Sequence, residues 1–261
     1  MAGLMEGSIP MARAWPMWLL IVAVLVILYA PLAPALLASV QGTGPGQWSF
    51  AAYGELLRTQ LITQSVRTTL LIALIVGIAT PILGLLAALS IRELHAPRLI
   101  LLVLLLPLFI PGVSMGLASA FLFRFLGIPP SLLTIAIVQI MWALPFATLI
   151  ILTVMATFDP AYLEAAYDAG ANGWQAFRDI EFPLIAPGIF GAASFSVIIS
   201  INETIRTSVV QGAWNTVPTY VWSTYKQVGL SPVLYALMSV VIIATVLLAG
   251  FYIVMNSRRK I

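Results

Sequence analysis

The chain alternates long apolar runs with short polar connections, and this alternation predicts helices that cross a lipid bilayer. A hydrocarbon core about 30 Å thick needs roughly 20 consecutive apolar residues in helical form. Six runs reach that length, and the spans that they predict lie at about 15–40, 65–91, 99–126, 131–157, 185–210 and 232–255. The pattern therefore predicts an all-α membrane protein with six transmembrane helices, in a single domain over residues 1–261.

The polar stretch at residues 158–184, between the fourth and fifth spans, is expected to be an ordered connection outside the lipid. It carries five of the nine acidic residues. Its first half predicts a short helix, because Asp159 is a good N-cap before Pro160 and Gly170 can take the left-handed conformation that ends a helix.

The second half of this connection predicts another short helix. Asn172 is a candidate N-cap with Gln175 as its capping-box partner, and Pro183 is expected to end the helix. The three-residue spacing of Trp174, Phe177 and Ile180 gives an apolar stripe. A helix this short is marginal in water unless that stripe is buried, so we expect a partner surface against it.

Composition supports a membrane protein and excludes several other classes. The chain is 61% hydrophobic and 8% charged, against about 25% charged in soluble domains. Its net charge of +3 is small, and the basic residues lie near span ends, which indicates membrane topology and not nucleic-acid binding. Without cysteine there is no disulfide or thiolate site, and the single histidine, His95, is expected to be a surface residue in a polar turn with no metal partner.

Catalytic chemistry finds no support in the sequence. A phosphate-binding loop needs a lysine after glycine, but the two lysines, Lys226 and Lys260, follow Tyr225 and Arg259. A lone histidine without cysteine gives no Ser/His or Cys/His arrangement. We therefore expect a chain that is not an enzyme and holds no cofactor or metal.

The remaining polar residues within spans are candidates for a solute path. An ionisable residue inside a span is costly and by default faces a bundle interior or an aqueous cavity. Glu203 and Arg206 are three residues apart on one face of a predicted helix, and Asn202 adds an uncharged polar group. With Trp142 of the fourth span, these residues either line the path near the outer leaflet or form a structural ion pair, and both interpretations stay open.

Six spans place the turn at residues 92–98, the 158–184 connection and the C-terminus on one side. Basic residues near span ends mark that side as cytoplasmic. Seven basic residues would then lie inside, namely Arg13, Arg92, Arg98, Arg178, Arg258, Arg259 and Lys260, against five outside, namely Arg58, Arg67, Arg124, Arg206 and Lys226. Both termini are therefore expected in the cytoplasm.

The 158–184 connection also carries a spaced motif. Its positions are Glu164, Ala165, Ala166, Gly170, Ile180 and Pro183. The pattern resembles the EAA motif of permease subunits in binding-protein-dependent ABC importers, with Phe182 where leucine is usual. The resemblance implies the type I ABC importer permease fold in a bacterial cytoplasmic (inner) membrane, with 158–184 as a cytoplasmic coupling loop formed by a pair of helices.

The resemblance also implies partners and roles. The coupling helices would insert into a groove of an ATP-binding subunit dimer, where Glu164 anchors, Ala165 and Ala166 allow close approach, and Gly170 forms the turn. ATP and magnesium would be bound by those partner subunits. A second homologous permease would complete the pathway, and a periplasmic or extracellular solute-binding protein would deliver the solute; whether the permease pair is heteromeric or homomeric stays open.

Weaker similarities extend over most of the chain. Trp48, Phe50, Tyr53, Ser65 and the pair Ser231-Pro232 are similar to the spermidine/putrescine branch of type I ABC permeases. That branch implies polyamine transport, or an amine-bearing small organic solute, with an acidic pair near 202–203. Here Asn202 replaces the first acid and Arg206 stands where an apolar residue is expected, which weakens the polyamine assignment.

A secondary carrier or channel working without an ATPase is the alternative function. It predicts inverted repeats and several ionisable residues near mid-bilayer. The sequence has no convincing repeat and a single off-centre charged cluster. The importer interpretation is therefore favoured.

Overall fold

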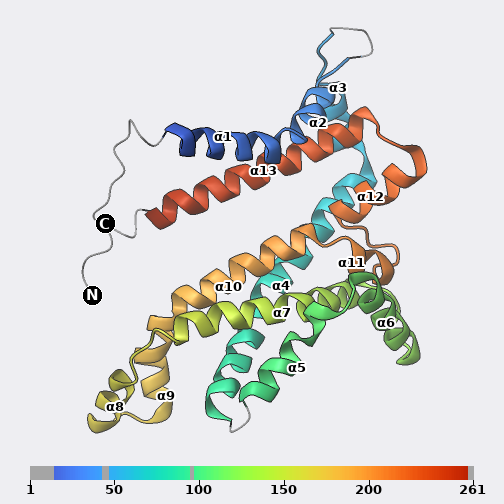
Figure 1. Cartoon of the computed structure of the whole chain (residues 1–261). Coiled ribbons are helices and arrows are strands. Elements are labelled where there is room, and N and C mark those ends of the chain that lie inside the picture. Colours follow the sequence, from blue (N-terminus) through green and yellow to red (C-terminus); the bar gives the residue numbers. More distant parts are fainter. Residues whose placement is uncertain (1–14, 43–46, 95–96, 258–261) are drawn as a thin grey trace. The chain divides into compact units, whose positions relative to one another are not determined.

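The computed structural model describes residues 15–42, 47–94 and 97–257, with side chains up to residue 247, and consists of helices (Figure 1). His95 lies outside the described residues, as do both terminal segments used in the topology prediction. The chain forms two compact units, Met1–Thr59 with Gln227–Ile261, and Gln60–Lys226. Each unit is described separately below.

The first unit contains α1 (Trp15–Tyr29), α2 (Leu32–Ser39), α3 (Ala51–Arg58) and α13 (Pro232–Ser257). The run predicted as one span at 15–40 is two helices bent by 52°. Pro31 precedes α2 and explains the break, because proline lacks the N–H that would continue the helical ladder and its ring clashes with the preceding turn. α13 packs on α2 and α3, and the hydroxyls of Ser39 and Tyr53 are hydrogen bonded at 2.8 Å.

Three long helices form the centre of the second unit: α4 (Gln60–Glu93), α7 (Leu132–Met155) and α10 (Phe182–Asn202). Each packs on the other two. Small residues let them approach closely, since a Cβ on Gly84 would lie 3.2 Å from Ala147, and one on Gly188 would lie 2.9 Å from Val154. Close packing at small residues is how helices associate in lipid, where no hydrophobic force drives them together.

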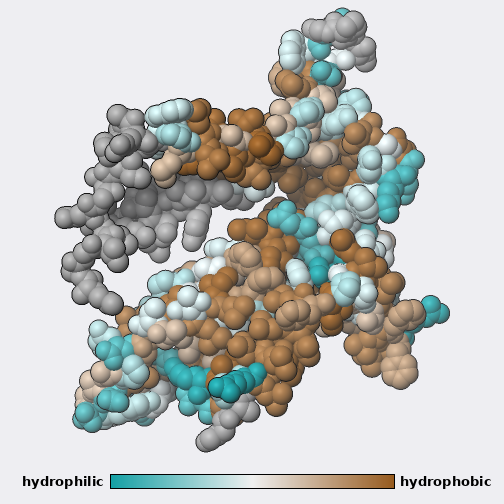
Figure 2. All heavy atoms as spheres, in the orientation of Figure 1, coloured by the Kyte–Doolittle hydropathy of each residue, from teal (hydrophilic) through white to brown (hydrophobic). Residues whose placement is uncertain are grey.

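The outer faces of these helices carry large apolar side chains, which Figure 2 shows as brown surface. Hydrophilic residues gather instead over α8 (Ala161–Asp168) and α9 (Gly173–Ala176). Three of the described helices or continuous helical segments are long and apolar enough to cross a membrane, or up to five if each bent pair counts as one span. The six-span count stays a prediction.

The run predicted as the third span is broken more sharply than a bent helix. α5 (Pro97–Phe109) and α6 (Gly112–Phe125) meet at 103°. Pro111 lies at the break, and its extended backbone (ψ 134°) separates the two helices. Gly112 and Gly116 lie where α6 packs on α11 (Ile205–Val210), and a Cβ on Gly116 would lie 3.2 Å from the Cα of Arg206.

The predicted outer loop at 211–231 contains a helix, α12 (Val217–Val228). Its first residue is fixed to the centre of the unit, because the backbone N–H of Val217 donates to the hydroxyl of Thr69 on α4 at 2.8 Å. Both residues are buried. This loop is thus anchored to the bundle at its start.

Candidate functional site

The first half of the polar connection folds as its local chemistry predicts. A carboxylate oxygen of Asp159 accepts the N–H of Ala161 at 3.0 Å as α8 begins. At the other end Gly170 has a φ of +86°, its N–H donates to Tyr167, and the N–H of Ala171 donates to Ala166. These two bonds form a Schellman motif, which ends the helix and turns the chain.

The second half begins as predicted but does not end at Pro183. The Asn172 and Gln175 side chains each accept the other's backbone N–H, at 3.0 and 2.9 Å, so the capping box is confirmed. After α9 the chain passes through a π-helical turn, η2 (Phe177–Glu181), directly into α10, giving one continuous helix over Gly173–Asn202.

The expectation that Pro183 ends the helix is therefore wrong. Pro183 lies inside this continuous helix, directly after the π-helical turn and Phe182. The wider π-turn before it shifts the hydrogen-bond register and relieves the clash that proline causes within an α-helix.

The motif residues divide between exposed and buried positions. Ala166 is the buried motif residue of α8, Ile180 is half-buried, and the others are exposed: Glu164, Ala165, Gly170 and Pro183. The predicted apolar stripe is only partly covered within the chain, because Trp174 remains 65% exposed while Phe177 and Ile180 are half-buried. Tyr162 and Tyr167 of α8 are also exposed, so α8 and α9 present three aromatic side chains to their surroundings.

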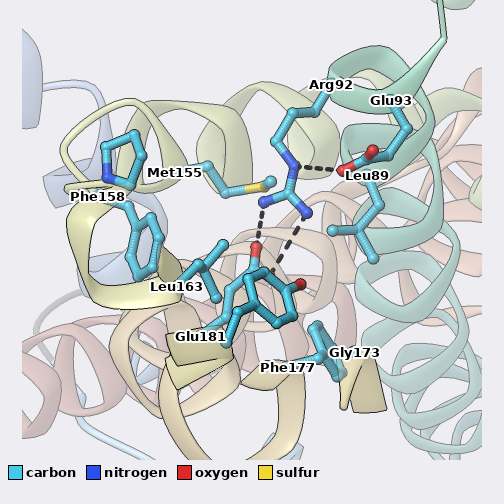
Figure 3. Close-up of a pocket in the computed structure, with 11 residues that line it drawn as sticks. Leu89, Arg92, Glu93, Met155, Phe158, Leu163, Gly173, Phe177 and Glu181 are labelled. Carbon is cyan, nitrogen blue, oxygen red and sulfur yellow. Dashed lines mark hydrogen bonds and ion pairs between the residues drawn. The ribbon is translucent and has the colours of Figure 1, made fainter. Parts of the chain in front are cut away.

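An ion pair with a buried carboxylate, which sequence reasoning missed, fixes this connection to α4. Glu181 is 3% exposed and accepts hydrogen bonds from both terminal nitrogens of Arg92, which lies 89 residues earlier at the end of α4. Figure 3 shows the guanidinium pointing at this carboxylate and also contacting Glu93. The signal in the sequence was a glutamate next to the apolar stripe, with an arginine expected on the same side of the membrane.

The ion pair borders a pocket of about 380 Å³. Its walls come from the ends of α4 and α7, from α8 and from the π-turn, and the labelled apolar residues in Figure 3 include Leu89, Met155, Phe158, Leu163 and Phe177. The pocket is therefore apolar with one charged wall, and it lies at the base of the helical hairpin.

A second, exposed ion pair lies nearby on the π-turn. Arg178 donates to both oxygens of Asp179, at 2.6 and 3.0 Å, and these hydrogen bonds hold the pKa of the Asp179 carboxyl below its ordinary value. Both side chains are solvated, so this pair contributes little to stability.

The candidate solute-path residues lie where the predicted fifth span breaks. α10 ends at Asn202, Glu203 has an extended backbone, and α11 begins at Ile205. The expectation that Glu203 and Arg206 share one face of a continuous helix is therefore wrong. Instead Glu203 lies ahead of α11, and its carboxylate accepts the backbone N–H of Arg206 at 2.9 Å, a favourable position for an anion at a helix start.

Glu203 and Arg206 nevertheless form the predicted ion pair. The other oxygen of Glu203 accepts a terminal guanidinium nitrogen of Arg206 at 2.7 Å, and the two residues are 7% and 8% exposed. The guanidinium carbon lies 3.7 Å from the ring centroid of Trp142 on α7, within cation–π distance. Three of the four candidates are thus brought together.

Asn202 does not join this cluster. Its side chain is exposed, and its amide nitrogen donates to the carbonyl of Ile198 within α10 at 2.8 Å. An asparagine amide that bonds to the preceding helical turn satisfies itself locally and offers little to a neighbour.

A buried polar chain next to the ion pair was also missed. Gln139 of α7 accepts from the hydroxyl of Ser200 at 2.6 Å and donates to the hydroxyl of Thr207 at 2.8 Å. All three residues are buried, and they join α7 to α10 and α11. A lone glutamine in an otherwise apolar span was the available signal, because a buried amide needs partners.

Among the residues that the structure describes, no cluster of three or more His, Cys, Asp or Glu side chains could hold a metal ion. The two buried carboxylates, Glu181 and Glu203, are each paired with an arginine instead. The arrangement can hold helices together and present polar groups along a bundle.

The family described as the inner membrane component of binding-protein-dependent transport systems matches residues 64–260. The putrescine transport system permease protein PotI of Escherichia coli K12 is 28% identical, covering 94% of this chain and 92% of PotI. The spermidine/putrescine permease PotC of the same strain is 28% identical, covering 53% and 52% of the two chains. The sulfate permease CysT, also of that strain, is 28% identical, covering 65% and 67%.

Solved structures show the same fold. A bacterial ABC transporter involved in the import of the acidic polysaccharide alginate matches with a TM-score of 0.70 at 19% identity, covering 92% of this chain and 96% of that chain. The alginate transporter in complex with its pentasaccharide-bound periplasmic protein matches with a TM-score of 0.68 at 19% identity, covering 91% and 92%.

Proposed function

The chain belongs to the family of inner membrane components of binding-protein-dependent transport systems, as a type I ABC importer permease, and from this we propose that it forms half of a solute pathway and couples to an ATP-binding subunit through residues 158–184. The observation that carries the coupling proposal is the helical hairpin of α8 and α9. Its turn is fixed by helix caps, and its side chains Tyr162, Tyr167 and Trp174 are exposed.

The hairpin is suited to docking because its shape is fixed before any partner arrives. The Schellman motif at Gly170 and the capping box at Asn172 set the turn between the two helices. Preorganisation of this kind lowers the entropy lost on binding. The exposed aromatic side chains supply apolar contact area of the kind enriched at protein interfaces.

Movement of the hairpin would reach the bundle by two routes. One is covalent, because η2 continues into α10 without a break. The other is the ion pair of Glu181 with Arg92, which connects the same turn to α4. A partner that pulls on the hairpin would therefore move α4 and α10 together.

Further partners complete the proposal. A dimer of ATP-binding subunits would bind ATP and magnesium, a second homologous permease would supply the other half of the pathway, and a solute-binding protein outside the membrane would deliver the solute. The family description and the periplasmic protein of the alginate complex support the last of these. Both termini and the hairpin would face the cytoplasm.

The proposed solute is a small organic compound, of the polyamine type or a related amine-bearing kind. PotI and PotC are named as permeases for putrescine and spermidine, which supports an amine. The similar CysT is named as a permease for sulfate, which is an anion and does not support a cationic solute. Glu203 already accepts two hydrogen bonds from Arg206, so it has less to offer a free polyamine than an unpaired carboxylate. An amine-bearing compound with further polar groups fits this cluster better.

Co-purification tests the coupling proposal. The tagged chain is expressed with its neighbouring transport genes, as wild type, Glu164→Ala and Gly170→Asp, and the bound ATP-binding subunit and its ATP turnover are measured. We expect the wild type to carry the subunit and Gly170→Asp to lose it or to lose stimulated turnover.

Gly127→Asp is the matched control. Gly127 also has a positive φ, +70°, with open space around its Cα, but it lies in the turn between α6 and α7. The Gly127→Asp variant should strain the backbone as much as Gly170→Asp does, but it should keep the ATP-binding subunit and its stimulated turnover. A wild-type chain that purifies alone and moves solute without nucleotide would favour the carrier or channel function instead.

A further inference from the structure

A buried guanidinium in the predicted outer half of the bundle is not fully used by the protein. Arg206 is 8% exposed, and its Nε is buried without a hydrogen-bond partner among the described residues. An unpaired buried donor is expensive, and ionisable residues within spans by default serve a solute path. Arg206 therefore has donor capacity left for a molecule that enters the bundle.

The surroundings of Arg206 hold the guanidinium in one place. The Trp142 ring centroid lies 3.7 Å from its central carbon, and a Cβ on Gly112 would lie 3.2 Å from the same atom. A larger residue at position 112 would push the guanidinium by a few tenths of an ångström, so Gly112 helps to keep it in place. A planar guanidinium held on an aromatic ring is preorganised to bind a carboxylate or phosphonate through two parallel hydrogen bonds.

Glu203 forms an ion pair with Arg206 but leaves the Nε donor of the guanidinium without a partner. One carboxylate oxygen of Glu203 is bound by a guanidinium nitrogen and the other by the backbone N–H of Arg206. The carboxylate therefore serves the start of α11 as well as the guanidinium, while the Nε edge of the guanidinium stays unpaired. An anionic acceptor would find an unused donor at that edge.

We infer that the transported solute carries an anionic oxygen group, a carboxylate or phosphonate, in addition to its amine, and that Arg206 binds this group. Arg206 is then the specificity-determining residue, with Trp142 and Gly112 positioning it. The inference rests on the proposed function, in which α7, α10 and α11 line the pathway. A solute with ammonium groups alone offers no acceptor for the unpaired Nε–H and would be disfavoured.

The test is a titration of the arginine side-chain N–H groups in the assembled transporter. The complex is labelled with ¹⁵N at arginine Nε and placed in lipid nanodiscs, without nucleotide and after vanadate trapping. The probes are methylphosphonate, acetate and putrescine. Arg206→Lys identifies the Arg206 signal among the ten arginines, and Arg124→Lys identifies that of Arg124, an exposed arginine at the end of α6.

We expect the Arg206 signal to shift saturably with methylphosphonate and acetate in at least one state. Putrescine should need at least tenfold higher concentration for an equal shift, and the Arg124 signal should stay in place. If Arg206→Lys does not assemble, Trp142→Phe identifies the signal instead, because a smaller ring changes the shift of the N–H group beside it.

Three results would overturn the inference: no saturable shift with either anion in both states, an equal response to putrescine, or an equal response of Arg124. The ATP turnover of the same samples separates this failure from that of the proposed function. If ATP turnover is intact but the Arg206 signal does not respond to the anions, only the solute assignment is wrong. If no ATP-binding subunit is bound, the proposed coupling is wrong.

Discussion

Two acid–arginine pairs, each with a buried carboxylate, lie in different regions of this protein, and they differ in what they connect. Glu181 pairs with Arg92 across 89 residues and joins the polar hairpin to α4. Glu203 pairs with Arg206 three residues away and holds the break between α10 and α11. The first pair can transmit movement between elements, whereas the second pair fixes a local shape and positions a guanidinium.

The pairs also differ in exposure, which sets how much each variant should cost. Both members of the Glu203 pair are less than a tenth exposed, while the side chain of Arg92 is 39% exposed. Removing one partner of a fully buried pair leaves a buried charge uncompensated. A partly exposed partner is screened by solvent, so the same change costs less.

The largest effect is expected from Glu203→Gln, which leaves the charge of Arg206 buried and unpaired. We expect a loss of about 3–5 kcal/mol in stability, measured as a lower thermal midpoint of the purified chain in nanodiscs. The double variant Glu203→Gln/Arg206→Met should recover most of this loss, because it also removes the charge. Equal midpoints for the single and double variants would show that the pair does not act through buried charge.

The next largest effect is expected from Arg92→Ala, which leaves Glu181 unpaired. Since Arg92 is partly solvated, a loss of about 1–3 kcal/mol is expected, together with reduced ATP turnover in the assembled complex. Arg98→Ala, which removes an exposed arginine near the same turn, should change neither quantity. If Arg92→Ala and Arg98→Ala changed stability and ATP turnover equally, the ion pair of Arg92 with Glu181 would not be what connects the hairpin to α4.

A smaller effect is expected from Gly170→Ala, because a side chain at a φ of +86° is strained by about 1–2 kcal/mol. Gly173→Ala should be neutral or stabilising by up to about 1 kcal/mol, since it lies within α9 and a Cβ there meets nothing. The rates of amide hydrogen exchange in α8 and α9 measure the change in local stability for both variants. Faster exchange in Gly173→Ala than in Gly170→Ala would contradict the Schellman turn.

The smallest effect is expected from Asn202→Ala. Its amide bonds only to its own helix and its side chain is exposed, so stability should change by less than about 0.5 kcal/mol. Solute transport should also be unchanged. A marked loss of solute transport in Asn202→Ala would instead indicate that Asn202 lines the solute path.

Sequence reasoning succeeded where short-range chemistry decides the structure. Gly170 and the Asn172–Gln175 box were predictable because caps depend on residues within one helical turn. The sharp break at Pro111 and the break at Glu203 were not predicted. Whether a proline bends or breaks a helix depends on how neighbouring helices satisfy the freed backbone groups.

Long-range pairs were missed for a related reason. Arg92 and Glu181, like Gln139 with Ser200 and Thr207, lie on elements far apart in sequence, and only packing brings them together. Pro183 shows the converse, because a single π-turn lets it lie within the helix that it was expected to end. Local residue preferences do not reveal which turn absorbs such a shift.

Site-directed crosslinking tests the proposed coupling most directly. The chain has no cysteine, so a single introduced thiol is unique. Ala165→Cys places it on the exposed face of α8, and Ala213→Cys places it at an exposed position in the predicted outer loop. A short bifunctional thiol-to-amine reagent should join the ATP-binding subunit to Ala165→Cys and not to Ala213→Cys. Crosslinking to neither, or equally to both, would contradict docking through the hairpin.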